Sequence, residues 1–418
     1  MKYFKTDGIR MNAKDLIFSL IPLRLGRILS RYSKRICIGF DTRSSSSEIF
    51  DLLVSGIITQ GVEVISLGVC PTSNLTLGIK ELNCDYGVMV TASHNPYYDN
   101  GIKVFSSTGE KLNKLEEREI EELLDKDIFI SRVNKLGKVS YSSLTRDKYI
   151  TYLRSLLLVK KDIKVLFDTS NGVLSSYIDK VFKDKITYTL INNSPNGNNI
   201  NLNCGSEYIS LLIDKIDEGY DYIVSFDGDA DRVVIINKNK EIITGDDLIY
   251  LFVKEYKYKE VVLTKMSNLG LIEELKKEQV EVTYSMVGDN NVYLKMKEIN
   301  SSLGGEPSGH ILFKDELVLN DGLLTFIKFL NLENKDISYF KYFNKTINLL
   351  SVNVNEELIS KIEEDINNKL EKGRVFIRKS GTEDLLRINV QVECKEKYLE
   401  VLSLLKEYFD IDDKLFLL

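Results

Sequence analysis

Three aspartates follow an apolar run that predicts a buried strand, Tyr222–Phe226, and they alternate with small residues: Asp227, Asp229 and Asp231. An extended loop with this spacing can turn all three carboxylates toward one point, and such oxygen ligands suit a hard cation such as Mg²⁺. An EF-hand is excluded because its loop requires glycine at the sixth position and glutamate at the twelfth, where this sequence has arginine and lysine. The spacing therefore predicts a divalent-metal site.

A serine and a histidine stand side by side after a second apolar run, in V-T-A-S-H-N-P-Y-Y-D-N-G-I-K-V-F (Val90–Phe105). A hydrolase serine is expected in a G-x-S-x-G elbow, which is absent around Ser93. The side chain of His94 is expected to point away from Ser93 in an extended segment, so a catalytic triad is not favoured. Phosphoryl transfer requires position, a cation and a general acid or base instead.

Two cations are candidates for that chemistry. Lys103, ten residues after the serine, could lie over the transferring group, and Arg10 follows a Thr-Asp-Gly turn signal that would hold it. The chain has two histidines, and both His94 and His310 fall in loops whose other residues could also do chemistry. This coincidence favours a functional role for both.

Two further loops could bind a sugar phosphate. In Gly304–His310 (G-G-E-P-S-G-H), glycines allow close approach of a ligand, while Glu306, Ser308 and His310 offer groups suited to sugar hydroxyls. In the second loop, R-K-S-G-T-E from Arg378, backbone N–H groups and hydroxyls are available to an anion. The residues that would form this phosphate clamp are Arg378, Ser380, Gly381, Thr382 and Arg387.

The elements that must position these loops alternate between strand and helix patterns, which predicts an α/β fold with polar loops at the strand ends. Three similar units are expected, followed by a smaller α+β domain. The expected limits are 1–155 with the serine loop, 156–245 with the metal loop, 246–345 with the sugar loop and 346–418 with the phosphate loop. The apolar segment Asp15–Leu29 is expected to be one amphipathic helix and not a secretory signal, since Pro22 and two arginines interrupt it.

Composition narrows the function classes. The net charge is −6, so a general grip on nucleic acid or anionic lipid is not expected. No apolar run approaches the roughly 18–20 residues needed to cross a bilayer. The five cysteines are scattered without a C-x-x-C pair and predict reduced thiols in a cytoplasmic protein.

Taken together, the four loops resemble the signatures of the α-D-phosphohexomutase superfamily, in the same order: Thr91–Pro96, Asp227–Arg232, Gly305–His310 and Arg378–Glu383. Within it the chain is most similar to the bacterial phosphoglucosamine mutases, through stretches such as Thr6–Arg10 and Tyr97–Lys103. The resemblance implies three related α/β domains and a smaller C-terminal domain around a central active-site cleft. It also implies an enzyme that interconverts glucosamine 6-phosphate and glucosamine 1-phosphate for UDP-N-acetylglucosamine and cell-wall synthesis.

The resemblance also implies roles for the residues. Ser93 would be carried as phosphoserine, one Mg²⁺ would bind the three aspartates and that phosphate, and a hexose 1,6-bisphosphate would be intermediate and activator. Proton transfer and charge stabilisation would fall to Lys103, Arg10, His94 and His310. Substrate binding would involve Arg232, Glu306, Ser308, His310 and the phosphate clamp. The implied partner is a small hexose phosphate, and the protein would be a monomer or homodimer.

Several positions depart from the family pattern, and they leave the choice of sugar open: Lys5, Met11, Asn290, Pro307, Lys379 and Asp384. A phosphoglucomutase/phosphomannomutase is therefore the alternative enzyme. A degenerate paralogue that only binds a phosphosugar is a further alternative, which the complete set of site residues argues against.

Overall fold

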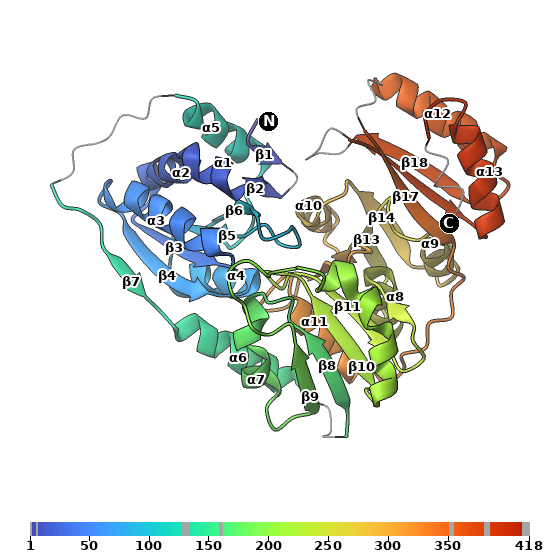
Figure 1. Cartoon of the computed structure of the whole chain (residues 1–418), viewed down its shortest axis with the longest axis horizontal. Coiled ribbons are helices and arrows are strands. Elements are labelled where there is room, and N and C mark those ends of the chain that lie inside the picture. Colours follow the sequence, from blue (N-terminus) through green and yellow to red (C-terminus); the bar gives the residue numbers. More distant parts are fainter. Residues whose placement is uncertain are drawn as a thin grey trace. The chain divides into compact units, whose positions relative to one another are not determined.

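The computed structural model describes residues 2–5, 7–126, 134–158, 162–350, 355–379 and 385–411. The chain divides into two compact units: Met1–Leu248 with Ser308–Lys335, and Ile249–Pro307 with Asp336–Leu418. Within the described residues the strands form four sheets accompanied by helices, which is the four-domain α/β architecture that the sequence predicts (Figure 1). The expected domain limits stay predictions.

The first sheet has seven strands in the order β1-β2-β6-β5-β3-β4-β7. Their bounds are Phe4–Lys5, Gly8–Asn12, Asp99–Ser106, Tyr86–Val90, Arg35–Phe40, Glu63–Val69 and Val139–Tyr141. Strand β5 runs parallel to β3, and β6 runs antiparallel to β5. The associated helices are α1 (Ala13–Phe18), α2 (Ile21–Leu29), α3 (Ser44–Ile58), α4 (Thr72–Glu81), α5 (Lys114–Leu124) and α6 (Leu144–Leu156).

The single helix expected over Asp15–Leu29 is wrong, because the segment forms two helices, α1 and α2. Leu20 adopts a left-handed backbone conformation (φ 54°) between them, and a proline stands in the first turn of α2. Proline lacks the N–H that a continuing helix needs and therefore suits a new helix start.

The second sheet has the order β12-β11-β10-β8-β9. Its strands are Ile242–Ile243, Val233–Asn237, Tyr222–Phe226, Lys164–Asp168 and Thr187–Ile191. Helix α7 (Ile178–Phe182) and helix α11 (Gly322–Asn331) belong to the same compact unit. Phe326 of α11 packs edge-on against Phe167 of β8 with ring centroids 5.5 Å apart, and Phe167 stacks on Phe226 of β10 at 6.3 Å. This aromatic core anchors the strand that leads into the aspartate loop.

In the second unit, β13 (Glu260–Thr264) pairs in parallel with β14 (Glu281–Ser285) and β15 (Leu303–Gly305). Helix α8 (Gly245–Tyr256) leads into this unit, which also holds α9 (Leu269–Lys277) and α10 (Asp289–Ile299). Strand β16 (Ile311–Phe313) belongs to the first unit.

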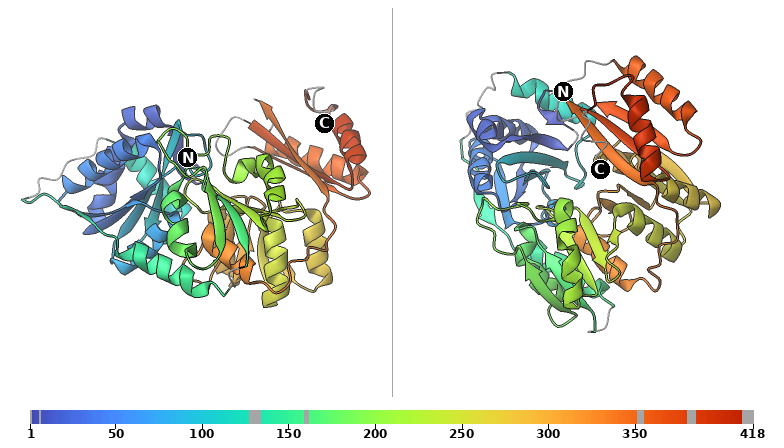
Figure 2. Two further views of the ribbon diagram at one scale, coloured as in Figure 1. Left: turned by 60° about the horizontal axis from the view of Figure 1, so that its bottom comes forward. Right: turned by 45° about the vertical axis from the view of Figure 1, so that its right-hand side comes forward.

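The last domain is the small α+β domain expected from the sequence. Its antiparallel sheet has the order β17-β19-β18, with bounds Phe343–Leu350, Leu385–Val392 and Arg374–Lys379. Helices α12 (Glu356–Lys369) and α13 (Lys395–Leu405) cover one face of this sheet, as Figure 2 shows. The alternating Ile388, Val390 and Val392 lie on one face of β19 and are buried in the core between the helices and the sheet.

None of the helices in the described parts of the chain has the length and apolar character that crossing a membrane would require. The fold positions the predicted site residues on loops that follow the ends of strands. The serine loop follows the end of β5, and the aspartate loop follows the end of β10, in the same compact unit.

Candidate active site

Ser93 lies in the loop between β5 and β6 and is 1% exposed. Its backbone is left-handed, with φ 50°, a conformation that a residue with a side chain rarely adopts. Its N–H donates to Thr91 Oγ1 at 2.9 Å, and its Oγ donates to Asp227 Oδ2 at 2.5 Å. The serine hydroxyl therefore faces the aspartate loop.

His94 does not point away from the serine, and that expectation from the sequence is wrong. Its Nδ1 lies 3.3 Å from Ser93 Oγ, because the left-handed turn at Ser93 removes the alternation of an extended segment. Burial lowers the pKa of His94, and the nearby Arg232 and Arg10 lower it further. The imidazole is therefore held in its neutral form at ordinary pH.

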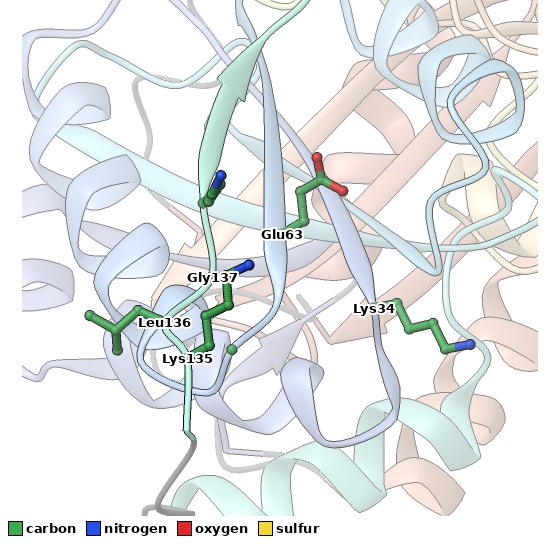
Figure 3. Close-up of a pocket in the computed structure, with 7 residues that line it drawn as sticks. Lys34, Glu63, Lys135, Leu136 and Gly137 are labelled. Carbon is green, nitrogen blue, oxygen red and sulfur yellow. The ribbon is translucent and has the colours of Figure 1, made fainter.

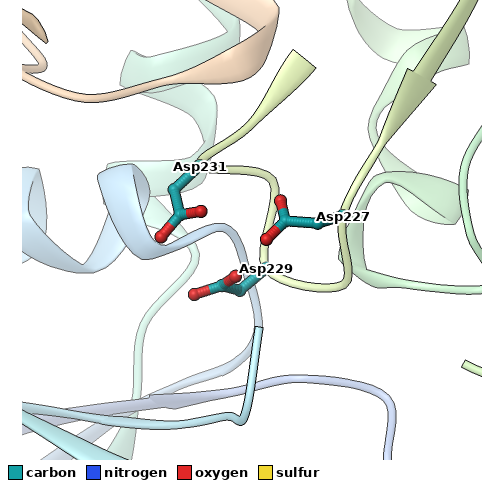
Figure 4. A group of neighbouring side chains, drawn as sticks. All are labelled: Asp227, Asp229 and Asp231. Atoms are coloured by element: carbon teal, nitrogen blue, oxygen red, sulfur yellow. The ribbon is translucent and has the colours of Figure 1, made fainter. Parts of the chain in front are cut away.

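The three aspartates lie on the loop between β10 and β11, and their carboxylates face a common point (Figure 4). One oxygen from each of Asp227, Asp229 and Asp231 lies within 4.8 Å of the others, and all three residues are buried. Gly228 lets this loop approach the serine loop, since a Cβ there would lie 2.8 Å from the carbonyl oxygen of Ser93. The sequence-predicted triad is thus assembled next to Ser93.

The donor set of this triad fits a hard divalent cation. Asp229 Oδ1 is buried and has no hydrogen-bond partner among the described residues. Burial raises the pKa of Asp227 well above its usual value, and the neighbouring Asp231 and Asp229 raise it further. A cation bound to these oxygens would remove the repulsion that the pKa shift of Asp227 reflects.

Lys103 lies on β6, is 2% exposed and contacts the same triad. Its Nζ donates to Asp229 Oδ2 and Asp231 Oδ2, both at 2.9 Å. Burial would raise the pKa of Asp231, but His310 and Lys103 outweigh it and hold that pKa well below its usual value. Lys103 therefore supplies a fixed positive charge directly beside the triad.

Asp7 is a site residue that the sequence reasoning missed. Its carboxylate binds Lys103 Nζ at 3.1 Å, Lys111 Nζ at 2.5 Å and Arg10 Nη2 at 3.1 Å. Burial would raise the pKa of Asp7, but these three cations hold it well below its usual value. Arg10 also donates to Asn95 Oδ1 at 2.9 Å in the serine loop. Asp7 lies within the Thr-Asp-Gly turn signal, from which the sequence predicts a role only for the arginine that follows it.

His310 and Arg232 complete the surroundings of the triad. His310 Nε2 lies 2.7 Å from Asp231 Oδ1, and its loop is held close because a Cβ on Gly309 (φ 93°) would lie 2.1 Å from the Val233 carbonyl oxygen. The backbone N–H of Arg232 donates to Asp227 Oδ1 at 3.1 Å, and its Nη1 donates to Glu207 at 2.9 Å. Ser308 is partly exposed on the loop before His310.

The remaining predicted residues belong to the second unit. Glu306 Oε1 accepts the N–H of Gly288 at 2.9 Å. Arg378 and Arg387 stand directly opposite each other on β18 and β19, a costly placement for like charges unless an anion compensates. Burial lowers the pKa of Arg378, Arg387 lowers it further, and Glu306 opposes this. Three predicted clamp residues lie outside the described residues: Ser380, Gly381 and Thr382.

A separate pocket of about 360 Å³ lies in the first domain (Figure 3). Its lining includes Lys34, Glu63 and Lys138, which stand at the amino ends of the parallel strands β3, β4 and β7. Ser93 follows the carboxyl end of β5, which is parallel to β3. The pocket therefore lies at the opposite ends of these strands from Ser93. In Figure 3 the side chain of Lys34 points away from Lys135.

Family models described as phosphoglucomutase/phosphomannomutase match nearly the whole chain. Alpha/beta/alpha domain I matches residues 1–131, domain II 147–240, domain III 244–342 and the C-terminal domain 345–403. Among curated relatives, phosphoglucosamine mutase of Staphylococcus epidermidis is 35% identical over 93% of this chain and 94% of its own length. That of Staphylococcus aureus is 35% identical over 96% and 97%.

Solved structures share the fold at low sequence identity. A phosphoglucomutase/phosphomannomutase family protein from Burkholderia thailandensis superposes with a TM-score of 0.80 at 19% identity, covering 97% of this chain and 96% of that one. N-acetylphosphoglucosamine mutase of Aspergillus fumigatus, in complex with GlcNAc-6P and magnesium, gives a TM-score of 0.68 at 15% identity, covering 96% and 94%.

Proposed function

Because the chain belongs to the phosphoglucomutase/phosphomannomutase family, we propose that it interconverts glucosamine 6-phosphate and glucosamine 1-phosphate. Family membership makes the protein an isomerase of the phosphohexomutase kind. The amino sugar is proposed because the Staphylococcus relatives at 35% identity are phosphoglucosamine mutases. One observation carries the proposed phosphoryl chemistry: the Ser93 hydroxyl lies 2.5 Å from Asp227, within a buried triad of carboxylates.

In the proposed cycle, Ser93 carries a phosphoryl group. The P–O bond to Ser93 breaks as a new P–O bond forms to a hydroxyl of the hexose phosphate, which gives a 1,6-bisphosphosugar. The attacking hydroxyl loses its proton, and Ser93 Oγ takes up a proton as its bond to phosphorus breaks; His94, whose Nδ1 lies 3.3 Å from Ser93 Oγ, is the candidate to carry this proton. The bisphosphosugar then turns around, and its other phosphoryl group returns to Ser93.

In this proposal the cations of the site stabilise the negative charge of the transferring phosphoryl group. Mg²⁺, held by the three aspartates and an oxygen of the serine phosphate, would neutralise charge on the transferring group when bound. Lys103 and Arg10 hold fixed positive charge near Ser93 through their shared partner Asp7. His310, bound to Asp231, orients that carboxylate and is the second candidate for proton transfer.

Substrate recognition is assigned to the other loops. Glu306, Ser308 and His310 would bind sugar hydroxyls, and Arg232 would contribute near the reacting phosphate. The phosphate that does not react would bind Arg378, Ser380, Gly381, Thr382 and Arg387. The facing arginines of β18 and β19 support this assignment, because an anion would relieve their repulsion. The product would supply UDP-N-acetylglucosamine synthesis.

A coupled assay tests the proposal with glucosamine, glucose and mannose phosphates, each with Mg²⁺ and the corresponding 1,6-bisphosphate. The amino sugar should give the highest kcat/KM. Faster turnover of glucose or mannose phosphate would instead make the protein a phosphoglucomutase/phosphomannomutase. Intact mass should show a fraction about 80 Da heavier, mapped to Ser93, since phosphoserine carries the added phosphoryl group. Ser93→Ala should have neither this mass nor mutase activity, and activity in that variant would contradict the mechanism.

A further inference from the structure

Arg43 precedes helix α3, and its guanidinium is buried with 0% of the side chain exposed. A guanidinium has five N–H donors. Nε donates to Asp41 Oδ2 at 2.9 Å, Nη1 donates to the carbonyl oxygens of Pro96 and Asp99, and Nη2 donates to those of Ser93 and Asn95. All five donors are therefore used inside the protein, so this arginine is not available to bind a substrate phosphate.

The acceptors of Arg43 reveal what it holds. Apart from Asp41, they are four backbone carbonyls of one segment, Ser93–Asp99, which connects β5 to β6. The bonds to Ser93 O and Asn95 O measure 3.0 and 2.8 Å, and that to Asp99 O measures 3.1 Å. A planar guanidinium that donates to four carbonyls of one loop fixes the backbone conformation of that loop, because each hydrogen bond constrains a direction as well as a distance.

Ser93 needs such support because of its left-handed backbone, with φ 50°. A non-glycine residue keeps this conformation only where its surroundings impose it. The carbonyl of Ser93 accepts from Arg43 and, at 2.7 Å, from Asn201 Nδ2. Its N–H donates to Thr91 Oγ1, whose hydroxyl donates to Asp41 Oδ2 at 2.7 Å. Asp41, through Thr91, and Arg43 thus hold the two peptide groups on either side of the Ser93 Cα.

We propose that Arg43 is a positioning residue that imposes the left-handed turn at Ser93 and so directs its Oγ toward Asp227. The inference rests on the proposed function only in assigning phosphoryl transfer to Ser93. Lysine cannot substitute, because an ammonium has three donors and lacks the planar fork, whereas the bonds of Arg43 spread over one carboxylate and four carbonyls.

Arg43→Lys tests the proposal against the matched variant Arg35→Lys, which alters an arginine of β3 that pairs with Glu63 at 2.9 Å and is partly exposed. With Arg43→Lys, kcat should fall about 10²-fold while the KM for the sugar phosphate changes little, because misplacing a reacting group costs rate before affinity. Arg35→Lys should keep wild-type kcat. In Arg43→Ala, added guanidinium chloride at millimolar concentration should restore part of kcat in a saturable way.

A readout independent of activity comes from the two histidines, because the imidazole NMR signals of His94 report on the serine loop and those of His310 report on the Asp231 carboxylate. Arg43→Lys should shift the signals of His94, which neighbours Ser93, and leave those of His310, which binds Asp231. If the wild type turns over no sugar phosphate, the proposed function fails, while a selective His94 shift still supports the role of Arg43. Wild-type kcat in Arg43→Lys overturns the role. Shifts at both histidines with a lowered melting temperature also overturn it, since Arg43 would then support the fold alone.

Discussion

Ser93 Oγ lies 2.5 Å from Asp227 Oδ2, although the two residues are 134 positions apart and follow strands of different sheets. The approach is possible because Gly228 packs against the Ser93 carbonyl, where a Cβ would clash. The hydroxyl that carries the proposed phosphoryl group and the carboxylates that would hold its cation thus form one constellation within one compact unit.

The first prediction concerns metal binding by the triad. Mg²⁺ at 100 times its dissociation constant should stabilise the wild type by about 2.7 kcal/mol, and EDTA should remove this gain. Asp227→Asn should lose most of the gain and reduce kcat by about 10²–10³-fold. In EDTA the variant should be as stable as the wild type or more so, because the raised pKa of Asp227 shows that its charge is unfavourable there.

The control for this prediction is Asp217→Asn in the same domain, an exposed aspartate whose carboxylate pairs with Lys240 at 2.7 Å. It should retain both the Mg²⁺ response and the activity. Differential scanning fluorimetry with and without Mg²⁺ measures the first quantity. An equal Mg²⁺ response in Asp227→Asn and the wild type would contradict the metal assignment.

The second prediction concerns the buried charge of Lys103. Lys103→Met should abolish measurable turnover, and it should lower the free energy of unfolding in EDTA by about 3–5 kcal/mol, because it leaves buried carboxylates without their cation. Mg²⁺ should restore part of this loss. Lys148→Met, at an ion pair with Glu81 whose side chains are 47% and 33% exposed, should cost no more than about 1 kcal/mol. Urea unfolding checks both values, and similar costs for the two variants would refute the prediction.

Much of this constellation was predictable because its signals are local. The apolar run Tyr222–Phe226 coincides with β10, and alternating aspartates directly after a buried strand have few other uses. The predicted α/β domains and the small α+β domain follow equally from local periodicity. The Asp-Asn-Gly-Ile-Lys stretch, by contrast, contains an Asn-Gly pair, which is typical of a turn, yet it lies in β6, where Gly101 pairs with Arg10 of the antiparallel strand β2.

The parts that could not be predicted depend on backbone angles and long-range contacts. The left-handed turn at Ser93 brings His94 back to the serine hydroxyl, and no sequence pattern marks that angle on a serine. Asp7 acquires its role only when Lys103, Lys111 and Arg10 converge on it. The role of Arg43 has no local signal, because nothing near it in the sequence indicates that four of its five guanidinium donors turn toward a loop about 50 residues away.

The third prediction concerns Thr72, at the start of α4, whose hydroxyl donates to Asp229 Oδ2 at 2.7 Å. Thr72→Val should leave this buried carboxylate with one donor fewer and lower the free energy of unfolding by about 1.5–3 kcal/mol. It should also weaken Mg²⁺ binding, because Asp229 loses a group that orients it. Thr72→Ser keeps the hydroxyl and should restore the Mg²⁺ affinity. Isothermal titration calorimetry measures the Mg²⁺ affinity of each variant. Equal affinities of Thr72→Val and Thr72→Ser would contradict the prediction.

The fourth prediction is a pH dependence that arises at a buried tyrosine outside the aspartate triad. Tyr149 is buried, and its hydroxyl donates to Asp321 Oδ2 at 2.5 Å, beside Ser73. Burial raises the pKa of Tyr149 well above 10.0, and the adjacent Asp321 raises it further. Above about pH 10 the unfolded chain therefore loses this proton while the folded protein keeps it. Folding stability should consequently fall as pH rises, with a limiting contribution of about 1.4 kcal/mol per pH unit.

Tyr149→Phe isolates this contribution, since phenylalanine has no proton to lose. The variant should be less stable than the wild type at pH 8, because Asp321 loses a donor, yet its stability should fall less steeply between pH 10 and 11. Tyr141→Phe, at a tyrosine that is 77% exposed, should keep the wild-type slope. Urea unfolding at a series of pH values measures these slopes. Equal slopes for Tyr149→Phe and the wild type would mean that Tyr149 ionises in the folded protein as readily as in the unfolded chain, which its burial against a carboxylate opposes.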